Sequence, residues 1–219
     1  MKFSAHNKQA GIATPLLIGG VVVVGIIVFL IASGTLKLSG SVSKNSDQSQ
    51  ENVQTPQPTA VPKVQVVLNP EPFTDAKLGL SISYPEGWKV NSAVDNVTIY
   101  KPSDTTGSGK ADALITVFSA PIGEFKDTKL ATIADLHKVQ LKKLFSDVII
   151  VKEGETEIGG QSAYEMEFTG VMGGENMHGE YIVLTSPTKL YAVLGGANAG
   201  MWNDLKDTLN ASIQTFKKQ

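Results

Sequence analysis

An uncharged apolar stretch near the N-terminus limits what this chain can fold into more than any other feature. From Gln9 to Leu36 there is no charged residue, and Val, Ile, Leu and Gly dominate. A bilayer's hydrocarbon core is ~30 Å thick, so ~20 apolar helical residues span it. No later stretch of the sequence approaches this length. We therefore predict one transmembrane helix over residues 11–36.

The charges before this stretch predict its orientation. Lys2, Lys8 and the amino group precede it, and the first ten residues include no acid. The positive-inside rule then places residues 1–10 in the cytoplasm and the C-terminal part outside the membrane. A cleaved signal peptide is the alternative, since residues 32–34 are small. Retention as an anchor is favoured because residues 16–31 exceed the ~7–15 residues of a signal peptide's apolar region.

Composition excludes several function classes. The chain has no Cys, which removes disulfides, thiolate nucleophiles and Cys-ligated metals. All of its basic residues are Lys, so the bidentate fork with which Arg binds phosphate or guanine is missing. From Gln65 onward, 14 Lys against 19 Asp plus Glu give a net charge of −5. We expect no nucleic-acid partner.

The segment between the apolar stretch and the remainder has the composition of a linker. Residues 37–72 are rich in Ser, Gln, Asn, Thr and Pro and poor in large apolar residues. Such a segment cannot offset its ordering entropy by burial. We predict a disordered linker over 37–72 and one globular domain over 73–219.

Within that domain, period-2 alternation predicts strands and period-3.6 patterns predict two helices. Short turns at Gly159-Gly160 and at Thr185–Lys189 make neighbouring strands antiparallel. The first helix is expected over 133–145, with Thr132 and Asp135 as a capping box, and the second over 200–217. The predicted strands contain residues 80–84, 97–99, 115–117, 148–151, 164–168, 181–184 and 190–194.

The resulting fold class is α+β, an antiparallel sheet whose apolar faces are covered by helices. The first helix places Ile133, Ala134, His137, Leu141 and Phe145 on one face. The second places an apolar stripe on one side, made up of Trp202, Leu205, Leu209, Ile213 and Phe216.

Three stretches together resemble the PsbP-like family. Residues 79–88 resemble its opening strand followed by Tyr-Pro-x-Gly-Trp, and residues 157–164 resemble its central hairpin. Residues 190–194 and the helix ending at 213–217 resemble its last strand and closing helix. The resemblance covers residues 66–219. The resemblance implies an α/β/α sandwich and a non-enzymatic role. The best-known relatives are extrinsic subunits that dock onto photosystem II, and we assign none of their docking residues to this chain.

Few residues suggest site chemistry. Glu175, His178 and Glu180 are the candidate metal ligands, since the segment 170–180 would bind a divalent cation if it folded back on itself. The alternative is a solvated hairpin tip, with His178 and Glu180 sharing one strand face by period 2.

Two further features have structural explanations that we favour. His137 lies on the apolar helix face, where we expect a core histidine bonded to a backbone carbonyl. Glu153, Glu155 and Glu157 alternate along one strand, where carboxylates are ordinarily solvated and discourage edge pairing. We therefore assign no catalytic, cofactor-binding or metal-binding residue.

Three functions follow from these observations. The first is a membrane-tethered, extracytoplasmic, non-enzymatic binding or assembly module of a bacterial envelope, with an envelope protein as partner. The alternative is a small-ligand or cell-wall-binding domain with a pocket between sheet and helices. The third is an envelope enzyme that uses Glu175, His178 or the row Glu153, Glu155 and Glu157. We expect that the protein is not an enzyme and binds no cofactor.

Overall fold

The computed structural model describes residues 37–38, 66–103 and 110–219. The predicted cytoplasmic residues 1–10 and transmembrane helix 11–36 lie outside the described residues, as does most of the predicted linker 37–72. Among the described residues, no helix combines the length and apolarity needed to span a bilayer. From residue 66 onward the chain follows the domain: the Val67 carbonyl accepts a hydrogen bond from the Glu86 N–H at 3.0 Å, and Leu68 forms a β-bridge with Pro85.

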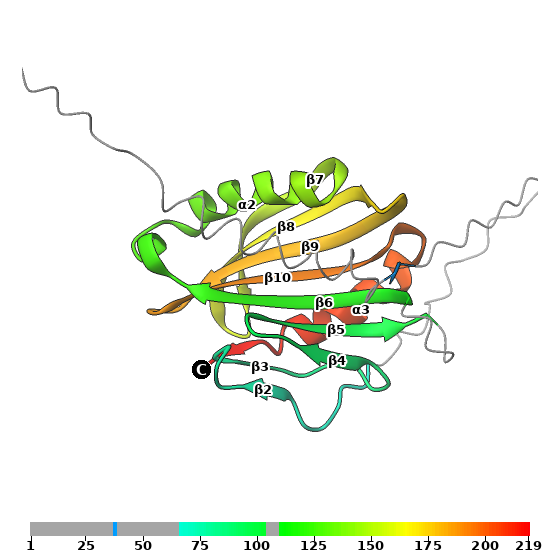
Figure 1. The fold of residues 1–219 in the computed structure, drawn as a ribbon, viewed down its shortest axis with the longest axis horizontal. Coiled ribbons are helices and arrows are strands. Elements are labelled where there is room, and N and C mark those ends of the chain that lie inside the picture. Colours follow the sequence, from blue (N-terminus) through cyan, green and yellow to red (C-terminus); the bar gives the residue numbers. More distant parts are fainter. Residues whose placement is uncertain (1–36, 39–65, 104–109) are drawn as a thin grey trace, which may run out of the picture.

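One large sheet organises the molecule, with the strand order β4-β5-β6-β10-β9-β8-β7 (Figure 1). Neighbours along this order are antiparallel, and short β1 pairs with β6 in parallel. The strands are β1 (Lys37–Leu38), β4 (Lys89–Ser92), β5 (Asn96–Pro102), β6 (Lys110–Pro121), β7 (Ser146–Ile158), β8 (Gln161–Met172), β9 (Glu175–Thr185) and β10 (Lys189–Asn198).

The segment 170–180 forms a hairpin tip, as the favoured alternative predicts, and does not fold back on itself, because β8 and β9 continue through most of it. Only Gly173 and Gly174 form the turn, and both have positive φ, 60° and 87°. A two-residue turn of this kind matches the twist of the strands and needs glycine. The candidate metal ligands therefore lie on a regular strand.

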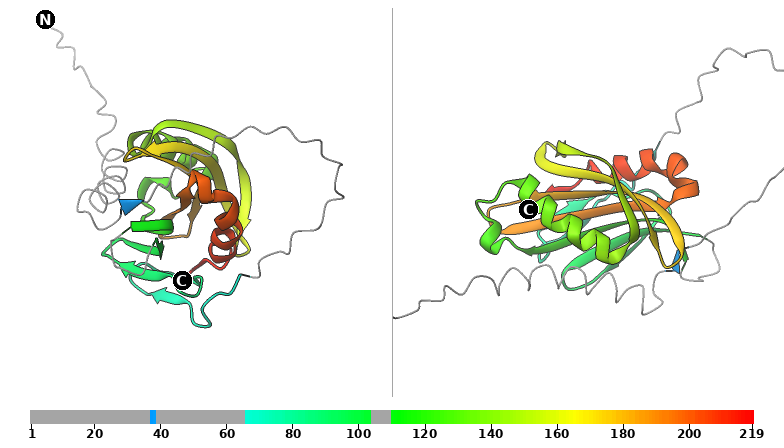
Figure 2. Two further views of the ribbon diagram at one scale, coloured as in Figure 1. Left: turned by 90° about the vertical axis from the view of Figure 1, so that its right-hand side faces the viewer. Right: turned by 90° about the horizontal axis from the view of Figure 1, so that it is seen from above.

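Helices cover opposite faces of the sheet, as the α+β prediction requires (Figures 1 and 2). α2 (Leu130–Leu144) packs on β7, β8 and β9, and α3 (Trp202–Ile213) packs on β10 and β6. Short 3₁₀ turns, η1 (Gly123–Phe125) and η2 (Ala199–Met201), precede them. The predicted capping box is wrong, since Lys129 is the N-cap and the backbone N–H of Thr132 already bonds to its carbonyl.

The second helix is shorter than predicted because its end is tied to another strand. The Ser212 hydroxyl donates to the Ser83 carbonyl at 2.5 Å, and the Ser83 N–H donates to Thr215 Oγ1 at 2.8 Å. The chain then forms β11 (Lys217–Lys218). β11 completes a small sheet of order β11-β3-β2 with β3 (Leu80–Ile82) and β2 (Phe73–Asp75).

Two apolar cores result, one on each side of the sheet. The α2 side gathers Ile133, Leu141, Phe145 and the apolar residues of β8 and β9 that face them. The α3 side gathers Trp202, Leu209 and the small sheet. The apolar stripes predicted for both helices are confirmed, including Phe216, which lies past the end of α3 but stays buried.

Candidate functional site

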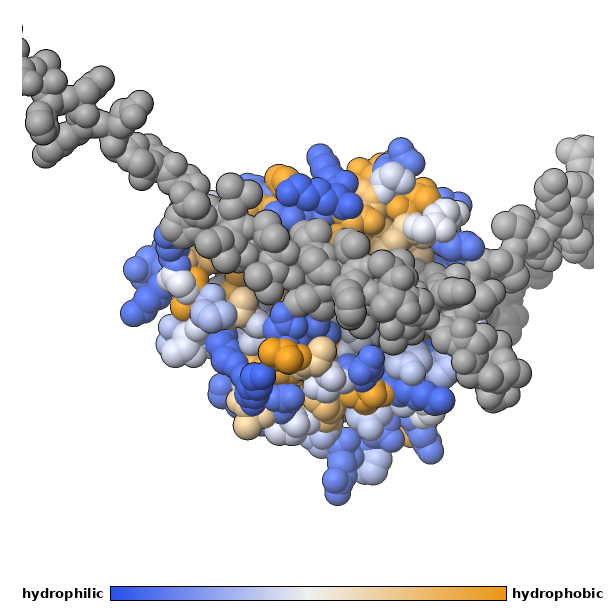
Figure 3. Space-filling model, viewed as in Figure 1, coloured by the Kyte–Doolittle hydropathy of each residue, from blue (hydrophilic) through white to orange (hydrophobic). Residues whose placement is uncertain are grey.

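Of the two strands that end the large sheet, β7 has the longer edge, with 13 residues against 4 in β4. β7 is the last strand of the sheet, and within the described residues no strand pairs with its outer side. It exposes two large apolar side chains, Ile149 (64% exposed) and Val151 (54%). Figure 3 shows apolar and hydrophilic residues side by side over α2 and β7, at the top of that view.

The pairing of β7 with β8 fixes which residues share a face. After a register shift between Ile150 and Lys152, the pairing runs regularly from Lys152 to Ile158. Glu153, Glu155 and Glu157 therefore lie on the α2 side, and all three are exposed as predicted for a solvated row. The row is regularly spaced, about 7 Å from one Glu to the next.

Only the first of these glutamates has an ion-pair partner among the described residues. Lys138 of α2 pairs with Glu153 and also donates to Asp135 at 2.9 Å. These two hydrogen bonds, that to Glu153 above all, raise the pKa of Lys138. Glu155 and Glu157 are left with free carboxylates at the edge.

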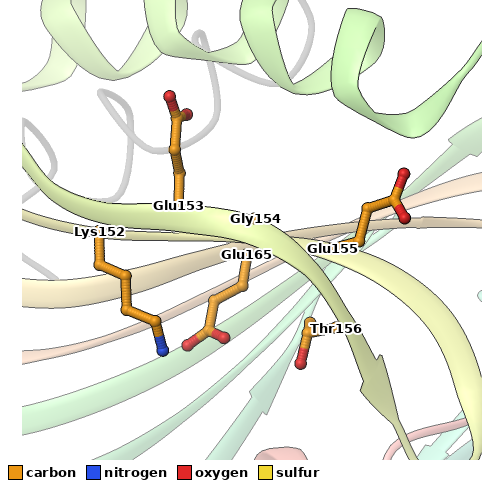
Figure 4. Close-up of a pocket in the computed structure, with 6 residues that line it drawn as sticks. All are labelled: Lys152, Glu153, Gly154, Glu155, Thr156 and Glu165. Carbon is orange, nitrogen blue, oxygen red and sulfur yellow. The ribbon is translucent and has the colours of Figure 1, made fainter.

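The α3 side of the same stretch is hollow at Gly154. Lys152, Thr156 and Glu165 of β8 extend to this side, whereas Glu153 extends toward α2 (Figure 4). They surround a shallow pocket of about 70 Å³. A Cβ placed on Gly154 would meet no atom within 4 Å, so the space beside this glycine is open.

A larger open groove lies beside the row of glutamates. It has a volume of about 680 Å³ and separates the first turn of α2 from the end of the β7–β8 hairpin. Leu130 and Ala131 form its apolar wall, and Glu155 and Glu157 its acidic wall. Ser162, Ala163, Thr156 and Lys129 complete it.

Beneath the edge, charged side chains form a row across three strands on the α3 side. Lys152 lies directly opposite Glu167, and Glu167 lies directly opposite Glu180. Like charges in directly opposed positions destabilise a sheet. Neighbouring groups must therefore offset the repulsion between Glu167 and Glu180.

For Glu180, a side chain of α3 offsets this repulsion with hydrogen bonds. Glu180 is 7% exposed. The Asn210 side chain, oriented with its nitrogen toward the carboxylate, donates to Glu180 Oε2 at 2.5 Å and to Oε1 at 3.3 Å. Burial, followed by the charge of Glu165, raises the pKa of Glu180 to about 7. Glu180 is thus a buried carboxyl group that exchanges its proton near neutral pH.

Glu167 is compensated by His178. Glu167 Oε1 lies 2.6 Å from His178 Nε2. The imidazole in turn stacks on the Trp202 indole, with ring centroids 4.3 Å apart and planes 13° apart. The first residue of α3 therefore packs on the sheet by stacking on an imidazole that is itself hydrogen-bonded to Glu167.

The candidate metal ligands divide between the two faces. His178 and Glu180 share the α3 side, as period 2 predicts, but Glu175 lies opposite Met172 on the α2 side. There its Oε2 accepts a hydrogen bond from Asn198 Nδ2 at 3.5 Å. Within the part of the chain that the structure describes, no three His, Asp or Glu residues lie close enough to hold a metal ion.

His137 is a core histidine, but its predicted partner is wrong. Its Nδ1 lies 2.5 Å from the Tyr181 hydroxyl rather than from a backbone carbonyl. The helix carbonyls are used within α2, whereas β9 presents Tyr181 directly beneath the ring. Burial lowers the pKa of His137 to about 4, so the ring is neutral at physiological pH.

The residues missed from the sequence are those that α3 brings to β9. Glu165 and Glu167 alternate visibly with apolar residues, and Gly173-Gly174 predicts a two-residue turn that sets Glu167 opposite Glu180. No sequence pattern indicates that Asn210 and Trp202 contact this row, because the contact depends on how the helix lies on the sheet.

Comparisons with known proteins agree with this fold. The model of the PsbP family matches residues 69–218. The solution structure of cyanobacterial PsbP (CyanoP) from Synechocystis sp. PCC 6803 is similar, with a TM-score of 0.53 and 17% identity, over 74% of this chain and 98% of that one.

Two further solved structures are more distant. LpqN, involved in cell envelope biogenesis of Mycobacterium tuberculosis, gives a TM-score of 0.42 and 15% identity, over 68% of this chain and 90% of its own. The Saccharomyces cerevisiae Ran-binding protein Mog1p gives 0.46 and 9%, over 69% and 96%. No curated protein matches the chain.

Proposed function

Because this chain belongs to the PsbP family, we propose that it is a membrane-tethered, extracytoplasmic, non-enzymatic module that binds an envelope protein through the outer edge of β7. The single observation that carries the proposal is this edge, a 13-residue strand with no strand on its outer side among the described residues. An exposed edge offers unpaired backbone N–H and C=O groups to a partner strand.

The surroundings of the edge support recognition of a protein. Ile149 and Val151 offer apolar contact at one end of β7, and free carboxylates offer polar contact at the other. The groove of about 680 Å³ lies beside the acidic end and accepts side chains of a bound segment. Apolar contact beside a polar, solvent-accessible rim is the usual anatomy of a protein interface.

Tethering rests on the sequence. The uncharged stretch from Gln9 to Leu36 is long enough to span a bilayer, and the linker over 37–72 gives the domain reach. Carbonate extraction of native membranes tests it, with the expectation that the protein stays in the pellet. Release into the supernatant would contradict the anchor.

Site-specific photocrosslinking in native membranes tests the binding edge. The full-length chain carries a photoreactive amino acid either at Val151 on β7 or at Val94, an exposed valine between β4 and β5. We expect a discrete crosslinked protein from the Val151 position alone, identified by mass spectrometry and reproduced from the partner's side. Equal products from both positions, or none from Val151, would refute the edge as the binding site.

The groove also favours a second candidate function, binding of a small ligand or wall fragment. Its volume falls in the range of ~300–1,000 Å³ that ligand sites occupy. It is open rather than enclosed, which favours the protein partner. Thermal shift of the full-length protein with muropeptides and short glycans distinguishes the two, since only the second function predicts stabilisation.

A further inference from the structure

We propose that the segment that binds along β7 is an extended stretch of the partner protein with basic residues at every second position. This inference rests on the proposed function and specifies the chemistry of the partner. It stands on the register of β7, on the space beside Gly154 and on the charges that line both sides of the edge.

The α2 side of the edge sets the spacing of the basic residues. A strand added to β7 places every second side chain opposite Glu153, Glu155 and Glu157. Opposite charges in such directly opposed pairs stabilise a sheet, and like charges destabilise it. Glu155 and Glu157 have no ion-pair partner in the described chain, so they are free to pair with the added strand.

The groove fits long basic side chains. A Lys or Arg opposite Glu155 or Glu157 would lay its aliphatic stem against Leu130 and Ala131 and keep its charge at the carboxylates. Lys129 also lines the groove and is the one basic residue among its lining side chains, against the two carboxylates of Glu155 and Glu157.

The α3 side admits a different kind of residue. Gly154 has open space where other residues carry a side chain, and Glu165 lies directly opposite it on β8. The shallow pocket of about 70 Å³ there accepts a small or polar side chain (Figure 4). The positions between the basic residues are therefore expected to be small and polar, with Thr as the best strand former.

A second copy of this chain is a poor occupant of the same edge. Two-fold antiparallel pairing keeps the α2 sides of both copies together, so residues of the glutamate row face one another. Over Lys152–Ile158, every register that overlaps by three residues or more sets Glu opposite Glu. The stretch Lys152–Ile158 of the edge is therefore protected against its own copy and complementary to a basic strand.

A synthetic peptide tests the inference on the full-length protein in zwitterionic detergent. The probe is acetyl-Thr-Lys-Thr-Lys-Thr-Lys-Thr-amide, labelled for fluorescence anisotropy, and hydrogen exchange by mass spectrometry follows the β7 amides. We expect saturable binding, weakened by salt, with slower exchange in β7. A block isomer with all three Lys at one end, and the peptide with Glu in place of Lys, are expected to bind at least about tenfold more weakly.

Variants test whether the peptide binds at Glu155 and Glu157. E155Q/E157Q is expected to weaken binding of the alternating peptide at least about tenfold. The matched control D204N/D207N removes two exposed acids from α3, changes the net charge equally and is expected to bind as the unmodified chain does. Gly154→Val fills the open space and is expected to weaken binding without altering the charge.

Three outcomes would overturn the inference. The first is equal binding of the alternating and block peptides, and the second is binding without protection of β7. The third is self-association of E155Q/E157Q with no peptide binding by the unmodified chain, which would make the row a device against self-pairing only. If crosslinking at Val151 still captures one protein, the proposed function stands and only the partner's chemistry is wrong.

Discussion

The two sides of β9 carry two different buried polar centres. On the α2 side, His137 and Tyr181 form a neutral pair in an otherwise apolar core. On the α3 side, Glu180, Glu167 and His178 lie in a row of ionisable groups under Asn210 and Trp202. The alternating directions of neighbouring side chains place Tyr181 and Glu180 on opposite faces. One strand therefore serves two chemically different cores.

The two centres are expected to respond to pH in opposite directions. The pKa of Glu180 is raised to about 7 in the folded protein, so the folded state binds more protons between its ordinary value of 4.5 and 7. Stability from this group is complete below pH 4.5 and is lost as pH rises to 7.

For His137 the sign is reversed. Its pKa is lowered from 6.5 to about 4, so the unfolded state binds more protons in that range. Stability is complete above pH 6.5 and is lost as pH falls to 4. The two ranges overlap, and their opposite slopes cancel near pH 5.5, where the two centres together predict a shallow maximum of stability. Burial thus raises the pKa of the acid on β9 and lowers that of the base on α2, because it disfavours the charged form of each.

Removing one aromatic ring from each side has the largest expected effect. Phe145→Ala leaves a dry cavity beside Phe168, whose ring lies 5.0 Å away. We expect a loss near the upper end of the usual 3–5 kcal/mol, about 5 kcal/mol. Trp202→Ala opens space beside His178 and Glu167, where water finds polar partners, and is expected to cost about 3 kcal/mol.

Urea unfolding of the full-length chain in detergent, followed by circular dichroism, measures this difference. The exposed Val94→Ala serves as the control and is expected to change little. An equal or larger loss for Trp202→Ala would contradict the contrast between a dry and a hydrated side.

Glu180→Gln removes the charge on the α3 side and keeps an acceptor for the Asn210 amide. A pKa moved from 4.5 to about 7 corresponds to at most about 3 kcal/mol of stability lost above pH 7. We expect the variant to be more stable than the unmodified chain at pH 8 by up to this amount, and unchanged at pH 4. Urea unfolding between pH 4 and 8 measures it, with exposed Glu124→Gln as control. A stability difference between the variant and the unmodified chain that does not grow between pH 4.5 and 7 would disprove the assignment.

Tyr181→Phe tests what keeps His137 neutral on the α2 side. It removes the hydroxyl beside His137 Nδ1 and leaves a buried ring nitrogen without its partner, which costs about 1–2 kcal/mol. The loss of stability as pH falls from 6.5 to 4 is expected to persist, because burial rather than the hydroxyl lowers the pKa of His137. Tyr164→Phe, on the same side but half-buried, is the control for the measurement. If the variant showed no loss of stability between pH 6.5 and 4, the hydroxyl and not burial would hold the imidazole neutral.

The sequence predicts the sheet better than it predicts what covers it. Alternation located strands that the structure extends, except for that over 80–84, where β3 ends at Ile82. Helical period found both apolar stripes, because each pattern depends only on neighbours along the chain. The short strands β2 and β4 carry too few residues for a pattern, and β11 forms only because Ser212 and Thr215 bond to Ser83.

The candidate site divides in the same way. The glutamate row was visible from period 2, and its exposure follows from its place on an edge strand. The raised pKa of Glu180 could not be predicted from the sequence, because it depends on Asn210 and Glu165, which the fold brings to it from a helix and another strand. Local patterns predict which residues share a face. They do not predict how dry that face becomes.

Lys138→Met has the smallest expected effect and tests the contrast between the buried centres and the exposed edge. Lys138 is 23% exposed and Glu153 36%, so water and salt screen their ion pair. We expect a loss of at most about 1 kcal/mol in urea unfolding at low salt, shrinking further at 1 M NaCl. Exposed Lys206→Met on α3 is the control for the change in charge. A loss above about 2 kcal/mol that salt does not alter would place this pair among the buried centres. The edge of β7 would then depend on α2 for its stability, and a partner strand would have to compete with Lys138 for Glu153.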